Sequence, residues 1–117
     1  MTNAAGPSPE TISVQELQGT VARFVSERDW EQFHAPRNLA MAISVEAAEL
    51  LELFKWSADN DGLSSLMPGL RDEIADVMIY CFSLCNQLSL DAAAIVEAKL
   101  ARNSEKYPVE RYKGRWR

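Results

Sequence analysis

The sequence is poor in several residue types and patterns on which common functional sites depend. Its 117 residues include one histidine, two cysteines and five glycines. No glycine-rich phosphate loop, strand-like alternation or repeat of solenoid length is present, which leaves helices as the expected building units. No apolar run is long enough to span a bilayer, and residues 1–9 lack the basic and apolar regions of a secretory signal. We therefore expect a cytoplasmic protein that does not bind membranes.

Excess positive charge is also missing. The net charge is −5 at pH 7, which argues against a protein that binds nucleic-acid polymers by neutralising their phosphates. A hydrophobic content of 47% and a charged content of 25% are typical of one soluble globular domain. Residues 106–117 are nevertheless rich in basic and aromatic side chains, so this tail is suited to meeting an anion.

The cysteines and the histidine do not complete a site for zinc or iron. Cys81 and Cys85 lie four residues apart, where two thiols cannot complete a tetrahedral zinc site and a disulfide within one helix would be strained. We interpret both as small core residues in a reducing compartment. The single histidine, His34, is not in the Glu-x-x-His spacing that di-iron helical bundles use.

The spacing of apolar residues predicts four helices. A capping box formed by Ser13 and Glu16 begins the first helix, and Pro36 suits the first turn of the second. Ser89 or Asp91 caps the fourth. The expected helices cover residues 13–27, 36–56, 70–87 and about 91–105, with a loop over residues 57–69. The predicted fold is an all-α four-helix bundle over residues 13–107, with a flexible lead at 1–12 and a basic tail at 108–117.

The third predicted helix is apolar nearly all round. One side carries acids among apolar residues, and the opposite side carries Ile74, Met78, Cys81, Phe82 and Cys85. Such a helix has to be covered on both sides, which a single four-helix chain does only in part. We therefore expect a homo-oligomer, at least a dimer, with this helix at its centre.

The most informative pattern is a pair of short acidic repeats, Glu46-Ala-Ala-Glu49 and Glu73-Ile-Ala-Asp76. Residues three apart share a helix face, so each repeat sets two acids side by side on an otherwise apolar stripe. Four carboxylates facing one another in a helical core are destabilising unless they are protonated or bind a cation. Mg²⁺, with Mn²⁺ as the alternative, prefers carboxylate oxygens and keeps waters for a phosphate substrate.

One acidic pair on a helix often arises by chance. Two such pairs on consecutive antiparallel helices arise by chance much less often. Glu52 lies off the acidic stripe and is expected to be a solvated surface acid. Residues 59–62 (Asp-Asn-Asp-Gly) look like the start of a calcium loop, but no glutamate follows at the position that such a loop requires.

Aromatic and polar residues outside the apolar stripes are candidates for nucleotide contacts. Trp30, His34 and Trp56 flank the second helix, where they either complete the core or stack on a nucleobase. A second group shares a late face of the fourth helix: Lys99, Asn103 and Tyr107. This face is either simply solvated or, if the acids hold a metal, contacts the oxygens of a triphosphate.

On these residues, the chain resembles the all-α nucleoside triphosphate pyrophosphohydrolases of the MazG-like superfamily, whose signature is ExxE followed after a spacer by ExxD. Segments 27–38 (ERDWEQFHAPRN), 52–56 (ELFKW) and 103–108 (NSEKYP) are similar to the dCTP pyrophosphatase branch. The resemblance covers residues 13–114.

The resemblance implies Mg²⁺-dependent hydrolysis of a deoxynucleoside triphosphate, either dCTP or a 5-modified dCTP, to the monophosphate and pyrophosphate, by a homotetramer. Glu46 or Glu49 would be the catalytic base. The implied metal ligands are Glu46, Glu49, Glu73 and Asp76. The implied substrate-binding residues are Trp30, His34, Trp56, Lys99, Asn103 and Tyr107.

Two other interpretations stay open at this point. A broader MazG-like hydrolase that prefers dUTP or other triphosphates would share the same metal site. A non-enzymatic helical adaptor that dimerises through the third helix would use the acids for solubility, and it predicts exposed acids and no response to metal.

Overall fold

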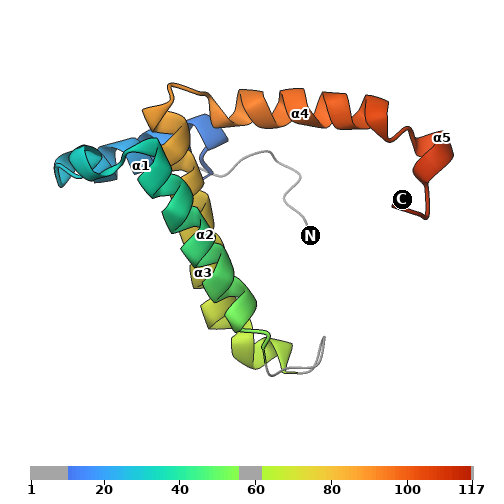
Figure 1. Ribbon diagram of the computed structural model, residues 1–117, viewed down its shortest axis with the longest axis horizontal. Coiled ribbons are helices and arrows are strands. Elements are labelled where there is room, and N and C mark those ends of the chain that lie inside the picture. Colours follow the sequence, from blue (N-terminus) through green and yellow to red (C-terminus); the bar gives the residue numbers. More distant parts are fainter. Residues whose placement is uncertain (1–10, 56–61, 117) are drawn as a thin grey trace.

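The computed structural model describes residues 11–55 and 62–116, and the regular elements within these ranges are all helical. They are α1 (Val14–Glu27), a 3-10 turn η1 (Glu31–Phe33), α2 (Pro36–Glu52), α3 (Leu63–Gln87), α4 (Ala92–Lys106) and α5 (Val109–Tyr112) (Figure 1). The all-α fold class predicted from the sequence is confirmed.

The predicted helix starts are largely correct because their caps are local. Ser13 Oγ accepts a hydrogen bond from the Glu16 backbone N–H at 3.0 Å, and Glu16 Oε1 accepts one from the Ser13 N–H at 2.8 Å. This reciprocal pair is the capping box of α1. Of the two candidates at α4, Asp91 is the cap, since its Oδ1 accepts from the Ala94 N–H at 3.2 Å.

The boundaries around the α2–α3 connection differ from the prediction. Helix α2 ends at Glu52, and α3 begins at Leu63 instead of residue 70, with Pro68 inside it. A proline there removes one backbone hydrogen bond near the helix start, and the apolar spacing of Leu63, Leu66 and Leu70 continues across it. Trp56 and the first part of the predicted loop, residues 57–61, lie outside the described residues.

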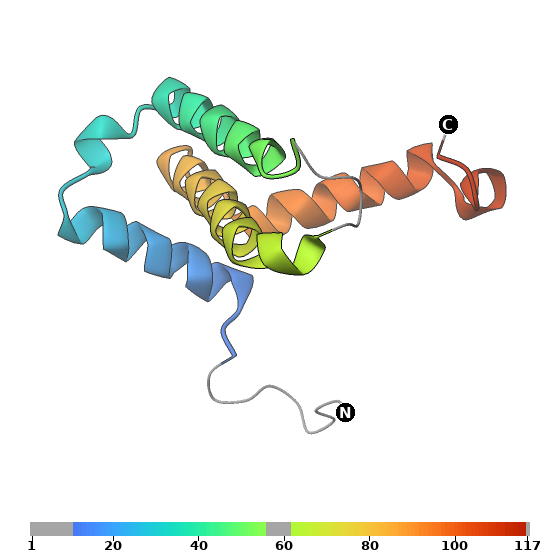
Figure 2. The same ribbon diagram turned by 90° about the horizontal axis from the view of Figure 1, so that it is seen from below.

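Helices α2 and α3 form an antiparallel pair, and α1 packs against the C-terminal half of α3 (Figure 2). Val21 of α1, Phe82 of α3 and Ala92 of α4 form a small core cluster, with Leu17 and Cys85 packed against it. Leu39 of α2 is the most deeply buried large side chain, at 2% exposure.

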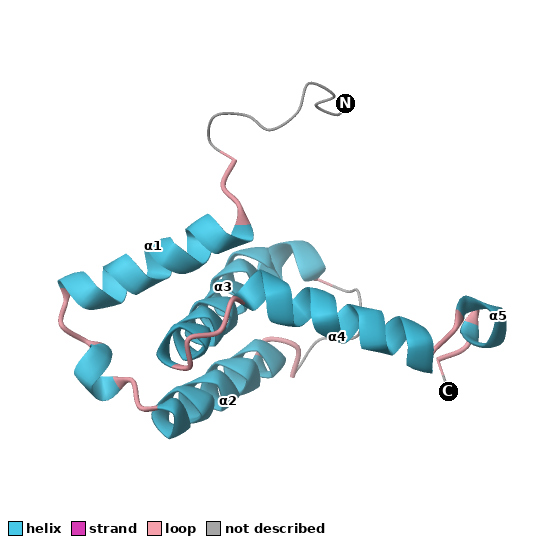
Figure 3. Ribbon diagram, turned by 90° about the horizontal axis from the view of Figure 1, so that it is seen from above, coloured by secondary structure: helices cyan, strands magenta, loops and turns pink. Residues whose placement is uncertain are grey.

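Helix α4 projects away from the three packed helices, which the expectation of a compact bundle did not include (Figures 1 and 3). The axes of α3 and α4 are bent by 100° from one another, and α4 packs mainly against α1. The radius of gyration is 17.6 Å, compared with about 13 Å for a compact domain of this length. Of the helices in the described ranges, none alone is long and apolar enough to cross a membrane, and only the bent α3–α4 pair passes by length and composition.

The side of α3 that faces away from the acids is exposed in the single chain. Met78 is 49% exposed and Ile74 is similar, although both are large apolar residues. Cys81 is exposed and Cys85 is half-buried, so the interpretation of both cysteines as core residues is wrong for Cys81 in one chain. Both thiols are free. Of the second apolar side predicted from the sequence, Ile74, Met78 and Cys81 are thus exposed, whereas Phe82 is buried against Val21 and Ala92.

Candidate functional site

The antiparallel packing of α2 and α3 brings three of the four predicted acids together. Glu46, Glu49 and Glu73 each offer a carboxylate oxygen, and these oxygens lie within 4.8 Å of one another. Glu46 and Glu73 are half-buried, whereas Glu49 is exposed. Two of the carboxylates therefore come from one turn of α2 and the third comes from the facing turn of α3.

The fourth acid, Asp76, lies beside Glu46 and lines the same cavity. The neighbouring Glu73 carboxyl, partial burial and the negative charges of Asp76 and Glu73 all raise the pKa of Glu46. These causes share one origin, because carboxylates that face one another favour the protonated form of a member. A bound cation would relieve the same repulsion.

The acid cluster fits a hard divalent cation. Glu73 Oε1 is buried and has no hydrogen-bond partner, so this oxygen is available as a ligand. The donors are all carboxylate oxygens, which Mg²⁺ and Mn²⁺ prefer over the nitrogen and sulfur ligands of zinc sites. Glu52, by contrast, is 68% exposed and its carboxylate lies 3.8 Å from the Lys55 amine, so the prediction of a surface acid is confirmed.

A glycine one turn from the cluster allows α2 and α3 to approach closely. A Cβ at Gly69 would lie 3.3 Å from Leu53 Cδ2, which is tighter than ordinary packing. Gly69 lies one turn before Glu73, and Leu53 lies one turn after Glu49. The absence of a side chain at residue 69 therefore helps to set the distance between the two acidic repeats.

A cavity of about 250 Å³ adjoins the acids. Apart from Glu46 and Asp76, its walls come from α1, the η1 segment and α3, and they are mostly aromatic or aliphatic. The remaining lining residues are Phe24, Val25, Trp30, His34, Ile79, Tyr80 and Ser83. An apolar space with acids at one edge suits a ligand with a flat ring and an anionic group that binds through a cation.

The end of α1 places Trp30 at this cavity through a Schellman motif. The Trp30 N–H donates to Val25 O at 3.0 Å and the Asp29 N–H donates to Ser26 O at 3.0 Å, with Asp29 in the left-handed region at φ 57°. This turn folds Trp30 back onto Phe24, and the two rings meet edge to face with centroids 5.8 Å apart. Trp30 stays 43% exposed, so part of its ring is free to contact a ligand.

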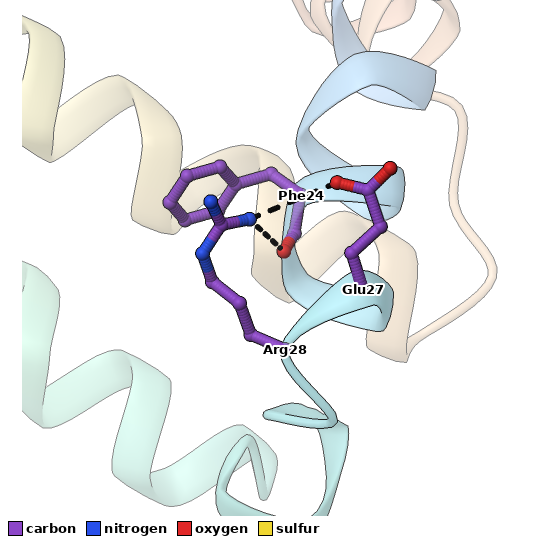
Figure 4. A network of polar contacts seen from close by, with 3 residues as sticks. All are labelled: Phe24, Glu27 and Arg28. Carbon is purple, nitrogen blue, oxygen red and sulfur yellow. Dashed lines mark hydrogen bonds and ion pairs between the residues drawn. The ribbon is translucent and has the colours of Figure 1, made fainter.

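Arg28 contacts Phe24, one ring of this pair (Figure 4). Its guanidinium lies 3.7 Å from the centre of the Phe24 ring, and its Nη1 donates to Phe24 O at 2.9 Å. Glu27 lies 3.8 Å from the same nitrogen, at a distance typical of a weak surface ion pair. Arg28 thus holds Phe24 in place beside Trp30.

The substrate-binding candidates on α4 are not brought to the acids within one chain. Exposed Lys99 and half-buried Asn103 lie on α4, which projects from the other helices, and exposed Tyr107 directly follows its last residue. Tyr107 instead packs edge to face on Tyr112 of α5, with ring centroids 5.1 Å apart. Trp56, the remaining candidate, lies outside the described residues.

Comparison with known proteins agrees with the acidic repeats. Residues 41–115, which include both repeats, match the MazG-like family. The chain belongs to the MazG-like family.

Characterised relatives of this MazG-like chain include dCTP pyrophosphatase 1 from Rattus norvegicus, which is 40% identical over 95% of the chain and 69% of the relative. The enzyme of the same name from Bos taurus is 37% identical over 97% of the chain and 71% of the relative. The crystal structure of a pyrophosphatase from Archaeoglobus fulgidus has the same fold, with a TM-score of 0.71 and 34% identity over 88% of this chain and 99% of that one.

Several residues that line the cavity in this MazG-like chain are not among the site residues predicted from the sequence. Ser83 and Ile79 of α3 and Phe24 of α1 all line it. Ser83 follows Asp76 by seven residues and so shares its helix face, which is a signal that the sequence does contain. Phe24 gives no such signal, because its position depends on how α1 packs against α3.

Proposed function

We propose that this MazG-like chain is a divalent-metal-dependent nucleoside triphosphate pyrophosphohydrolase that prefers dCTP or a 5-substituted dCTP. The products are the nucleoside monophosphate and pyrophosphate. The observation that carries the proposal is the cluster of Glu46, Glu49 and Glu73, with an unpaired buried oxygen, at the edge of an aromatic cavity. Relatives at 37–40% identity named dCTP pyrophosphatase 1 support the substrate class.

In this proposal the acids have two roles: they hold the metal, and one of them accepts a proton. Glu46, Glu49, Glu73 and Asp76 would hold Mg²⁺, which supplies neutralisation of phosphate charge and orientation of a water. A carboxylate of Glu46 or Glu49 accepts the proton of the attacking water. The new P–O bond forms as the bond between the nucleotide phosphate and the pyrophosphate oxygen breaks, with the electron pair leaving on pyrophosphate.

The cavity side chains would hold the nucleoside. Trp30 presents a ring face to the base, and His34 lies on the same wall of the cavity. Its volume of about 250 Å³ is sufficient for one nucleobase. Trp56 completes the base site in this proposal.

The α4 residues and the exposed side of α3 require a second copy. We expect the apolar side around Met78 to be covered by another copy, in a dimer that pairs again as a tetramer. Lys99, Asn103 and Tyr107 would then contact the nucleotide in the assembled oligomer, since their helix projects from its own chain. A projecting helix of this kind would be covered by another copy when the oligomer assembles.

A substrate panel tests the proposal. Purified protein is incubated with each common deoxynucleoside and ribonucleoside triphosphate in Mg²⁺, and released pyrophosphate is measured. The expected result is pyrophosphate release that is fastest with dCTP or 5-methyl-dCTP and stops when a chelator is added. Equal rates on dUTP or purine nucleotides would replace the dCTP preference with a broader hydrolase, and no release from any nucleotide would overturn the enzymatic proposal.

A further inference from the structure

Three buried side-chain polar atoms among the described residues have no hydrogen-bond partner: Glu73 Oε1, His34 Nδ1 and Ser83 Oγ. The first belongs to the acid cluster. The other two lie together on the cavity that contains Glu46 and Asp76. Since buried polar atoms in folded proteins are nearly always paired, two unpaired atoms on one cavity are candidates for hydrogen bonds to a bound ligand.

Ser83 is the more informative of the two. It is 3% exposed and lies on α3 two turns beyond Asp76. A second cavity of about 290 Å³ adjoins the first, and the two share Val25, His34 and Ser83. Ser83 therefore lies where the two cavities meet, at the end of the lining stripe of α3 that is farther along the helix from Asp76.

We propose that Ser83, together with His34, hydrogen-bonds the polar edge of the base of the bound nucleotide and is a specificity-determining residue. The inference rests on the proposed function. With the phosphates at the acids and the base against Trp30, a residue two helical turns beyond Asp76 faces the far edge of the base. A hydroxyl can donate or accept there, and His34 Nδ1 adds a second partner.

The free protein and its complex respond oppositely to loss of the hydroxyl. Without nucleotide, Ser83 Oγ is buried without a partner, so Ser83→Ala removes an uncompensated polar group and raises the melting temperature. With nucleotide, the same substitution removes a hydrogen bond, so it raises KM by about three- to tenfold and leaves kcat unchanged. A serine with only a structural role does not give this pair of effects.

The experiment measures melting and steady-state kinetics of wild type, Ser83→Ala and the control Ser26→Ala, an exposed serine on α1. The substrates are dCTP and the 2,4-difluorotoluene deoxynucleoside triphosphate, a pyrimidine-shaped nucleotide whose ring offers no normal hydrogen-bonding edge. The expected KM increase in Ser83→Ala is seen with dCTP and is absent with the isostere, while Ser26→Ala matches wild type throughout.

An unchanged KM for dCTP in Ser83→Ala, or equal losses on both nucleotides, overturns the role of Ser83 while leaving the hydrolase proposal intact. If wild type releases pyrophosphate from neither nucleotide, the proposed function itself fails and the inference fails with it. The two failures are distinguished by the wild-type rate alone.

Discussion

The α2–α3 pair and the α4–α5 arm carry candidate residues in contrasting ways. In the helix pair, antiparallel packing within one chain brings Glu46, Glu49 and Glu73 within 4.8 Å. In the arm, exposed Lys99 lies on a helix bent by 100° from α3, and exposed Tyr107 directly follows that helix. Packing within one chain is therefore enough to assemble the acid cluster, but it does not bring the candidate residues of the arm to that cluster.

The largest expected effect comes from breaking the helix pair's acid cluster. Glu49→Gln should lower kcat/KM by about 10²- to 10⁴-fold, because it removes a metal ligand or the base. In metal-free buffer the variant should be as stable as wild type or more so, since it removes one of several facing negative charges. Pyrophosphate release and thermal melting measure the two effects.

Glu52→Gln is the matched control, because Glu52 is one turn further along the same helix but 68% exposed. It should keep wild-type rates. Comparable turnover in Glu49→Gln and wild type would remove Glu49 from the site.

The next largest effect tests whether the exposed side of α3 is an interface. Met78→Glu should dissociate or unfold the oligomer, since burying an unpaired charge costs several kcal/mol. Light scattering and melting report the change, and Ser64→Glu, an exposed position near the start of the same helix, should leave the assembly intact. A wild-type mass near 13.1 kDa at micromolar concentration would show that no interface forms.

The third prediction concerns whether the cavity or the α4–α5 arm contacts the base. Trp30→Ala should lower kcat/KM by about ten- to a hundredfold, because stacking on an aromatic ring is worth roughly 1–3 kcal/mol per base. Lys99→Met should instead weaken all triphosphates alike, since a lysine contacts phosphate and carries no base preference. Inhibition by inorganic tripolyphosphate, which has no base, separates the roles, because its binding should weaken in Lys99→Met and not in Trp30→Ala. A Trp30→Ala variant that loses only stability would be structural.

The smallest effect concerns the N-terminal capping box of α1, at the end of the helix away from Trp30. Ser13→Ala should cost about 1 kcal/mol of unfolding free energy at neutral pH. Its hydrogen bonds with Ser13 lower the pKa of Glu16 below 4.5, so the box contributes stability above that value and loses it as the pH falls through the folded-state pKa. Urea unfolding at pH 7 and pH 3 should therefore show a smaller difference between variant and wild type at pH 3, and an equal difference at both would exclude the Glu16 contribution.

The sequence predicts those parts of the molecule that depend on local chemistry. The Ser13 cap and the facing acids follow from spacing alone, because they involve residues a few positions apart or a simple helical hairpin. Spacing limits the cap of α4 to Ser89 or Asp91, and the structure decides for Asp91. Pro68 makes the predicted start of α3 too late, since a proline near a helix start is tolerated when apolar spacing continues through it. The direction of α4 depends instead on a long-range contact, in which buried Gln18 accepts from the Ala92 N–H at 2.9 Å and donates to Leu90 O at 2.8 Å.

The same distinction between local and long-range features applies to the residues of the site. Its acids are visible in the sequence because their residue type contradicts the apolar stripe around them. Ser83 is inconspicuous, because a serine in a helix is common and only its 3% exposure and unpaired hydroxyl set it apart. The low exposure of Ser83 results from the packing of three helices, which a short sequence pattern does not predict.

Thermal melting with and without Mg²⁺ shows whether the facing carboxylates form a metal site. A cation that binds only the folded state stabilises it and relieves the repulsion that raises the pKa of Glu46. Millimolar Mg²⁺ should raise the melting temperature of wild type and of Glu52→Gln, and the increase should be much smaller in Glu49→Gln. A wild-type melting temperature that does not change with Mg²⁺ or Mn²⁺ would contradict the assignment of a metal site.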